Sequence, residues 1–279
     1  MPGTAIPGTP PSGTRVPGTA VPVEAAPRTA RARARAELTV EIKDTARRHL
    51  ATQGAAALSL RAVARDLGMA SSAVYRYFAS RDELLTALII DAYDAVGATA
   101  ERADADAVRD AVDIGTRWLL VCRAVRSWAL AHPQEFALVY GSPVVGYAAP
   151  VDTVEPATRI ARVLAAVTAD AVRDGALEPS AHPLPGPRLL EPGVVELAGG
   201  IPDAPFEDVI ERSLTMWIAL VGAINFELFG HLHQVVTDKV AFFDVAMAVA
   251  AEGAGLIVPL AAGPAPRKRP ERRPVSRRR

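Results

Sequence analysis

The sequence predicts an all-α protein, and three observations support that fold class. Half of the 279 residues are hydrophobic but only 5% are aromatic, and the apolar content comes mainly from Ala, Val and Leu, which suits closely packed helices. Between the two ends of the chain, apolar residues recur every three or four positions, as on one face of a helix. The sequence shows no strand series. A chain of this length can bury a sizeable core.

The two ends of the chain differ in composition from the rest. Residues 1–27 follow a loose repeat, PGTAIPGTPPSGTRVPGTAVP, which carries too little apolar side chain to offset the entropy of ordering. We therefore expect residues 1–34 to form a disordered, Pro/Gly-rich and basic tail. Residues 256–279 predict a second disordered tail, whose many arginines either contact phosphates or are simply solvated.

The first ordered segment predicts four helices. In the first of them apolar residues recur every four positions from Leu38 to Leu50, and Gly54 stands where a helix would end. Ser80 followed by Glu83 forms a capping-box pattern that starts the fourth helix. The predicted helices cover 36–53, 60–67 and 71–78, and the fourth continues to about residue 102.

The remainder of the chain predicts longer helices. Their apolar periodicity covers 105–131, 134–140, 156–174, 206–231 and 236–253. The segment 175–205 is rich in proline, so we expect a long loop there, with a short helix near 194–197.

The charge is unevenly distributed although the net charge is zero. From Arg28 to Arg81 the chain carries eleven basic and four acidic residues, whereas 82–263 carries eleven basic and 25 acidic residues. This pattern indicates a basic module that meets a polyanion and an acidic body that repels it. A single cysteine, Cys122, predicts packing and no internal disulfide, and the absence of a signal-like or membrane-spanning run predicts a cytoplasmic protein with no membrane partner.

The segment LSLRAVARDLGMASSAVYRYFASRDELL predicts two helices that cross closely, joined by a tight turn at Gly68. Apolar residues on both helices form the shared core, which includes Phe78. The opposite face of the second helix can then reach phosphates and base edges in a DNA major groove. That face carries Ser71, Ser72, Tyr75 and Arg76.

This segment resembles the recognition-helix signature of the tetracycline-repressor (TetR) family of transcription regulators. The resemblance implies a helix-turn-helix DNA-binding domain over 35–82 that recognises double-stranded DNA. Met69-Ala70 replaces the usual Val-Ser, so the helix takes its cap from Ser71 or is uncapped. The matching residues are Gly68, Val74, Tyr75, Tyr77, Phe78, Ser80 and Leu84.

Several further residues of this segment are candidates for DNA contact. We expect Tyr77 to contact phosphate, while Tyr75 fits either phosphate or core. Arg61 and Arg81 lie near helix starts, where backbone phosphates bind, and Arg81 replaces the family's usual Lys. The alternative is a plain helical hairpin with the aromatics as core and Ser59 and Ser80 as caps. Three arginines before the first helix either enter a minor groove or are solvated; these are Arg31, Arg33 and Arg35.

The body, predicted over 83–255, resembles the TetR C-terminal domain named for a Trp, His, Gly pattern. Trp217, Gly222, Glu227 and Gly230 match that pattern, but Val221 stands at the His position. Four aromatic residues are predicted to line a cavity for an apolar effector, with ordinary core as the alternative. These residues are Trp118, Trp128, Tyr140 and Trp217. The resemblance also implies a dimer, for which the apolar stripe predicts Ile210, Leu214, Trp217, Ile218 and Val221.

The function predicted from these features is a ligand-responsive transcriptional repressor that binds a palindromic operator as a homodimer. A small apolar effector would release it from DNA. The alternative is a helical small-molecule-binding protein without sequence-specific DNA recognition. The sequence contains no enzymatic or cofactor motif, and His231-x-His233 is interpreted as surface histidines rather than a metal site.

Overall fold

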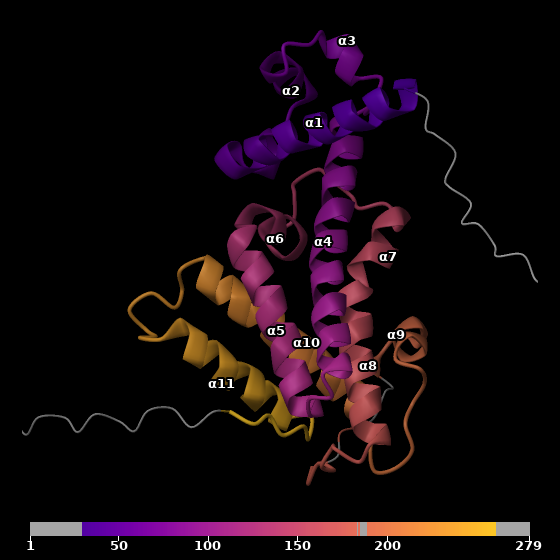
Figure 1. The fold of residues 1–279 in the computed structure, drawn as a ribbon, viewed down its shortest axis with the longest axis vertical. Coiled ribbons are helices and arrows are strands. Elements are labelled where there is room, and N and C mark those ends of the chain that lie inside the picture. The colour runs from indigo at the N-terminus through magenta and orange to yellow at the C-terminus, as the bar shows by residue number, and fades with distance from the viewer. Residues whose placement is uncertain (1–29, 183, 185–188, 261–279) are drawn as a thin grey trace, which may run out of the picture. The chain divides into compact units, whose positions relative to one another are not determined.

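The computed structural model describes residues 30–182, 184 and 189–260, and these residues form an all-α fold (Figure 1). One isolated bridge pairs Leu177 with Leu256, and the described residues contain no β-strand. The α-helices are α1 (Ala30–Gln53), α2 (Leu60–Asp66), α3 (Ser71–Val74), α4 (Arg81–Arg109), α5 (Ile114–Ala131), α6 (Pro133–Tyr140), α7 (Val154–Ala157), α8 (Arg159–Arg173), α9 (Pro192–Leu197), α10 (Val209–Leu228) and α11 (Lys239–Glu252), with 3₁₀ turns η1 (Ala55–Ala57) and η2 (Val151–Thr153).

The chain divides after Leu38 into two compact units. In the first unit, α1 begins at Ala30 rather than at residue 36, so the expectation of a tail through residue 34 is wrong for residues 30–34. The segment ARARARAEL alternates alanine and arginine, and both are good helix formers. Residues 31–37 are exposed, including all three arginines. The expectations for residues 1–29 and 261–279 lie outside the described residues.

Two predicted boundaries differ from the structure for local reasons. Helix α3 ends at Val74 and the next three residues form a turn, whereas the sequence predicted helix through residue 78. The break between α4 and α5 follows Arg109 rather than residue 102. Ala111 adopts φ 51°, and the Asp113 side chain accepts a bond from Thr116 N that caps α5. Helix α4 therefore continues unbroken past the predicted domain boundary at 82/83.

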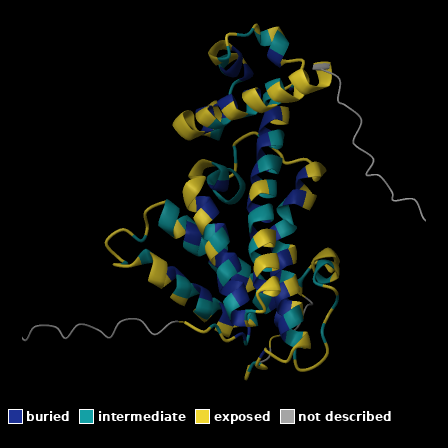
Figure 2. Cartoon of the chain, in the orientation of Figure 1, coloured by how far each residue is buried: buried dark blue, intermediate teal, exposed yellow. Residues whose placement is uncertain are grey.

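The core of the body gathers residues of α4, α5, α8, α10 and α11, and Figure 1 shows α4 lying between α5 and α8. Figure 2 shows the buried residues on the facing sides of these helices. Trp118 is fully buried, and its indole N–H donates to the carbonyl of Met247 at 3.1 Å. Cys122 is also fully buried, and burial raises the pKa of its thiol. Both side chains serve as packing in the core.

An arginine clamp joins α8 to α4. Arg159, at the start of α8, donates to the carboxylates of Asp94 at 2.7 Å and Glu101 at 2.8 Å, both on α4. Hydrogen bonding from Arg159 lowers the pKa of Glu101. The arginine stem lies against Gly97, where an added Cβ would stand 2.7 Å from Arg159 Cβ. The absence of a side chain at position 97 lets the two helices approach closely.

The segment after α11 returns to the core instead of starting a tail at residue 256. Glu178 N donates to Gly255 O at 2.8 Å, and Leu256 is buried. The predicted tail boundary is therefore wrong at Leu256, whose apolar side chain belongs to the core. Among the described helices, α10 alone is long and apolar enough by length and composition to cross a membrane; its residues Leu220 and Ile224 are fully buried in the core.

Candidate DNA-binding surface and ligand cavity

Helices α2 and α3 pack through a small apolar core. Val63 and Ala64 of α2, Val74 of α3 and the following Phe78 are all buried. Between the helices Gly68 adopts φ 66°, a conformation that glycine takes without strain, and Met69 N donates to Ala64 O at 2.9 Å. This arrangement is a helix-turn-helix with its apolar sides turned inward.

The residues predicted to contact DNA are distributed over the polar side of this unit. Arg61, Ser72, Tyr75 and Arg76 are exposed, and Ser71 and Tyr77 are half-buried. Tyr75 is 43% exposed, which favours the surface interpretation over the core one. The residue before α3 is Ala70, and no side chain caps the helix, as the replacement of the usual Val-Ser suggested.

Arg81 makes internal contacts that the sequence did not reveal. Its guanidinium donates to the carbonyl of Ala55 at 2.9 Å and to Asp82 at 3.1 Å. Beside it, Ser80 accepts from Glu83 N, as the predicted capping box requires. The return bond differs, because the Glu83 carboxylate accepts from the N–H of Ala79, one residue before the cap. Arg81 thus fixes the turn η1 against the start of α4, and its side chain remains 29% exposed.

Other charged residues of the module form hydrogen bonds and ion pairs within the fold. His49 is buried, and its Nε2 lies 2.6 Å from Asp66 Oδ2; this hydrogen bond lowers the pKa of Asp66. Lys43 and Arg47 of α1 both bind Asp91 of α4. The overall positive charge of the module therefore overstates the number of cations that face outward.

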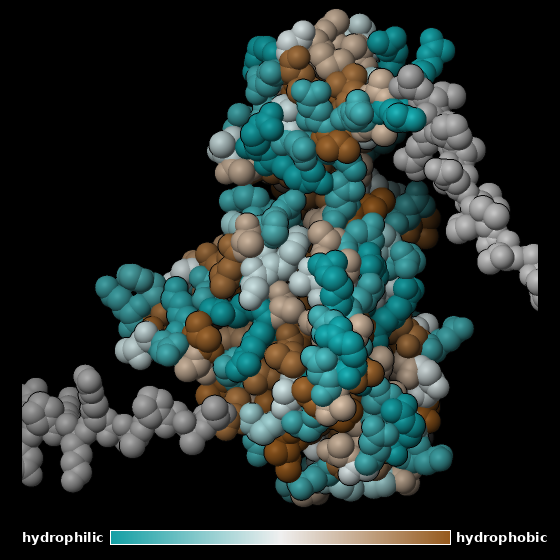
Figure 3. Space-filling view, in the orientation of Figure 1, coloured by the Kyte–Doolittle hydropathy of each residue, from teal (hydrophilic) through white to brown (hydrophobic). Residues whose placement is uncertain are grey.

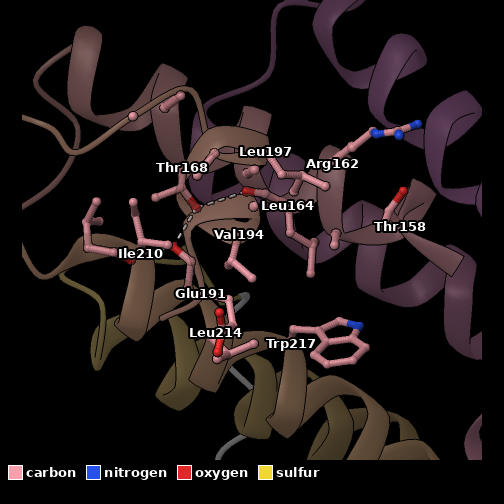
Figure 4. Close-up of a pocket in the computed structure, with 18 of the residues that line it drawn as sticks. Thr158, Arg162, Leu164, Thr168, Glu191, Val194, Leu197, Ile210, Leu214 and Trp217 are labelled. Atoms are coloured by element: carbon pink, nitrogen blue, oxygen red, sulfur yellow. Dashed lines mark hydrogen bonds between the residues drawn. The ribbon is translucent and has the colours of Figure 1, made fainter. Parts of the chain in front are cut away.

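The body contains a cavity of about 810 Å³ among α7, α8, α9 and α10 (Figure 4). Its wall is mostly aliphatic, with Leu164, Val194 and Leu214 facing the space and Trp217 at one side. The polar groups in the wall are few, and two of them are the hydroxyls of Thr168 and Ser213. Such a cavity suits a largely apolar molecule.

Two comparisons identify the family. Residues 42–88 match the family model described as bacterial regulatory proteins, tetR family, and residues 118–250 match the tetracyclin repressor-like C-terminal domain. HTH-type transcriptional regulators of Mycobacterium tuberculosis and Mycobacterium bovis are each 40% identical to this chain over 213 residues, 76% of this chain and 89% of the relative. The chain belongs to the TetR family. It is accordingly a DNA-binding transcriptional regulator and not an enzyme.

Solved structures agree with this assignment. The regulatory protein SCO4313 is 31% identical, with a TM-score of 0.60 over 79% of this chain and 98% of its own. A regulatory protein of the TetR family from Rhodococcus RHA1 is 15% identical, with a TM-score of 0.54 over 78% of this chain and 97% of its own, and shares the fold. The Trp, His, Gly subtype of the C-terminal domain stays a prediction.

The structure corrects the predicted pocket residues of this TetR protein. Only Trp217 lies in the cavity wall. Trp118 is fully buried in the core, and Trp128 is buried and stacks on His132. Tyr140 contacts the edge of Trp217 at 6.4 Å between ring centroids without lining the cavity. Large rings fill space in this body, and small aliphatic residues border the space that is left open.

The predicted dimer stripe divides between two sides of α10. Ile210 is buried, and Ile210, Leu214 and Trp217 line the cavity, so these three residues face inward. Ile218 is 59% exposed and Val221 is half-buried. The exposed apolar side continues through residues that the stripe did not include, and Figure 3 shows hydrophobic side chains at the surface in the region of α11. These additional residues are Phe226, Phe229, Phe242, Val245 and Val249.

Within the described residues, no group of three or more His, Cys, Asp or Glu side chains could hold a metal ion. His231 and His233 are both exposed, and the ring of His231 lies against Phe226.

Proposed function

We propose that this TetR-family regulator is a cytoplasmic homodimeric repressor that binds a palindromic operator and is released by a small apolar effector. The cavity of about 810 Å³ carries the proposal, because an empty apolar space of that size in the body of a DNA-binding regulator has no role in packing. The proposal has three parts: the DNA contact, the dimer and the effector.

The exposed residues of the helix-turn-helix support the DNA contact. Arg76 and Ser72 lie on the outward side of the unit, where side chains can meet base edges. We propose Arg61, Ser71, Tyr75 and Tyr77 as phosphate contacts around them. We propose Arg81 mainly as a positioning residue, because its guanidinium donates to the carbonyl of Ala55 and so fixes η1 against the start of α4.

The apolar surface of α10 and α11 supports the dimer. Ile218 and Phe226 of α10 and Val245 and Val249 of α11 are each between 46% and 61% exposed, and exposed apolar side chains on two neighbouring helices favour association. A second copy would bury it through the same surface under two-fold symmetry, which a palindromic operator mirrors. We expect Phe226→Glu to convert the dimer to a monomer in light scattering at micromolar concentration, whereas Val145→Glu, on an exposed loop, leaves the mass unchanged.

The arginine clamp supports communication between effector and DNA. Thr158 lines the cavity, and the next residue, Arg159, binds α4 through Asp94 and Glu101. Helix α4 begins at Arg81, directly after the helix-turn-helix. An effector that shifts the start of α8 would therefore shift α4. A preference of about 2 to 3 kcal/mol for the released conformation would lower operator affinity roughly thirty- to 150-fold.

Selection of bound duplexes from a random pool tests the proposal. We expect an enriched sequence with two inverted half-sites, one or more turns of DNA apart. Apolar compounds are then titrated against the protein with and without the selected duplex. Tryptophan fluorescence measures ligand binding, and DNA retardation measures release of the duplex. Enrichment of an asymmetric sequence would overturn the dimeric operator. If the ligand binds equally well with and without operator DNA, the release mechanism is overturned.

A further inference from the structure

Two hydroxyl groups, those of Thr168 and Ser213, lie next to each other in the cavity wall. Thr168 Oγ1 donates to the carbonyl of Leu164 at 2.9 Å, and Ser213 Oγ lies 2.7 Å from the carbonyl of Val209 and 3.0 Å from Thr168 Oγ1. Figure 4 shows Thr168 beside the cavity, and Ser213, which also lines the cavity, is its hydrogen-bond partner. A hydroxyl has one proton, and both protons are directed to acceptors inside the protein. Each oxygen keeps a lone pair that is not engaged in a hydrogen bond. The pair can therefore accept a hydrogen bond from a ligand, while both of its protons are already donated within the protein.

The other polar side chains in the inner wall add no free donor. Thr158 Oγ1 donates to the carbonyl of Glu155 at 2.8 Å. The indole nitrogen of Trp217 is covered by protein, although it has no hydrogen-bond partner, so Trp217 meets the cavity with its carbon atoms. A ligand group that needs a donor, such as a carboxylate, finds none among these side chains.

The charged residues around the cavity disfavour an anion as well. Arg162 is the single cation among the lining residues; one nitrogen of its half-exposed guanidinium donates to Glu155 at 2.9 Å, which offsets the charge. Glu191 supplies a second carboxylate, which Figure 4 shows near Leu214. One cation against two carboxylates leaves a net negative charge at the cavity, and a carboxylate ligand would be repelled by it.

We propose that the cavity selects an uncharged, largely apolar molecule that carries a hydroxyl, and that it discriminates against the corresponding carboxylate. The hydroxyl would donate its single proton to Ser213 Oγ, beside Thr168, while the apolar part lies against the aliphatic wall. This inference rests on the proposed effector site and adds the chemical class of the effector to it.

Three compounds with ten-carbon skeletons test the class. 1-Decanol and 1-methoxynonane are isomers, and the ether has no donor; decanoate carries the charge. Binding to the full chain is followed by tryptophan fluorescence, with Trp217→Phe assigning the signal to the cavity. We expect 1-decanol to bind roughly three- to tenfold tighter than its isomer, as one hydrogen bond provides, and at least tenfold tighter than decanoate.

A matched pair of variants locates the donor contact. Ser213→Ala should reduce the difference between 1-decanol and 1-methoxynonane to less than twofold, whereas Ser127→Ala, on the exposed side of α5, should leave the difference unchanged. Equal binding of the isomers, or decanoate binding as tightly as 1-decanol, would overturn the hydroxyl inference and leave an apolar effector standing. Failure of all three compounds to bind would overturn the inference and the apolar effector together.

Discussion

The DNA-binding module and the C-terminal body are both built from helices, but their candidate functional groups are placed in opposite ways. In the module, polar side chains such as Ser72 and Arg76 stand on the outside of a small filled core. In the body, the proposed effector site is a space that the core leaves open between α8 and α10. A substitution can therefore remove binding in the module with little effect on folding, whereas in the body the residues around the cavity also contribute to packing.

The strongest test of this contrast is removal of an aromatic ring from the body. Trp118→Ala should lower the free energy of unfolding by about 3 to 5 kcal/mol, because the ring is fully buried and its removal leaves a cavity. Trp217→Ala, at the wall of an existing cavity, should cost about 1 kcal/mol and abolish effector binding. Denaturant titrations measure both. Equal stability losses would mean that Trp118 and Trp217 play the same role.

The next largest effect is expected on DNA. Arg76→Ala should weaken operator binding by about 1 to 3 kcal/mol and relax base preference at one position of each half-site, if its guanidinium reads a guanine. The free energy of unfolding should stay within about 0.5 kcal/mol of the parent, because Arg76 is exposed. Arg109→Ala, at the end of α4, is the control for a lost surface arginine. If Arg76→Ala keeps the parent's affinity and base preference, the proposal that α3 lies in the major groove is contradicted.

Arg81 should show a mixed effect that separates positioning from contact. Arg81→Ala loses the bond to the carbonyl of Ala55, so we expect a stability loss of about 0.5 to 1.5 kcal/mol. DNA binding should weaken for all sequences alike, and the salt dependence should fall. Arg81→Lys keeps the charge but cannot bind Asp82 and the carbonyl of Ala55 at the same time as a guanidinium does. Compared with Arg81→Ala, it should restore the salt dependence of DNA binding more fully than the free energy of unfolding. A stability loss with unchanged salt dependence would make Arg81 purely structural.

The smallest expected effect is a pH dependence inside the module. The hydrogen bond with His49 holds the pKa of Asp66 below its ordinary value of 3.8. The folded-state pKa is thus lower than the unfolded one, so Asp66 contributes stability above pH 3.8 and loses that contribution as the pH falls through its lower folded value. The stability difference between the parent and Asp66→Asn should narrow on acidification, measured by denaturant titration. Asp203→Asn, in a loop of the body, is the control. If the stability difference between the parent and Asp66→Asn does not change with pH, the ionised Asp66 carboxylate does not contribute through its bond to His49.

The sequence predicted the module better than the body, and the reason is physical. The helix-turn-helix is local: its core residues, its turn at Gly68 and its outward polar residues lie within one short segment, so spacing alone orders them. The cap that Ser80 provides to Glu83 N is local in the same way. Contacts such as the one between Arg81 and the carbonyl of Ala55 join more distant residues and left no signal in the sequence.

A cavity in the body was predicted, but its wall could not be, because nothing in a sequence marks which side chains border an unfilled space. Its wall joins Val154, Thr168, Val194 and Trp217 from four helices. Trp118 and Trp128 were expected there because large rings pack irregularly, but in this body they fill the core. The start of α1 was missed for another reason: the first arginines were expected in a tail that either enters a minor groove or is solvated, whereas alternating alanine and arginine favours a helix.

The close approach of α4 to Arg159 also constrains how this protein can diverge. Any residue larger than glycine at position 97 would collide with the arginine stem, and a shorter residue at position 159 would leave Asp94 and Glu101 without their cation. Neither position can drift alone without loosening α8 from α4. Descendants that keep the response to an effector should therefore retain both Gly97 and Arg159, so that the two positions are inherited as a pair.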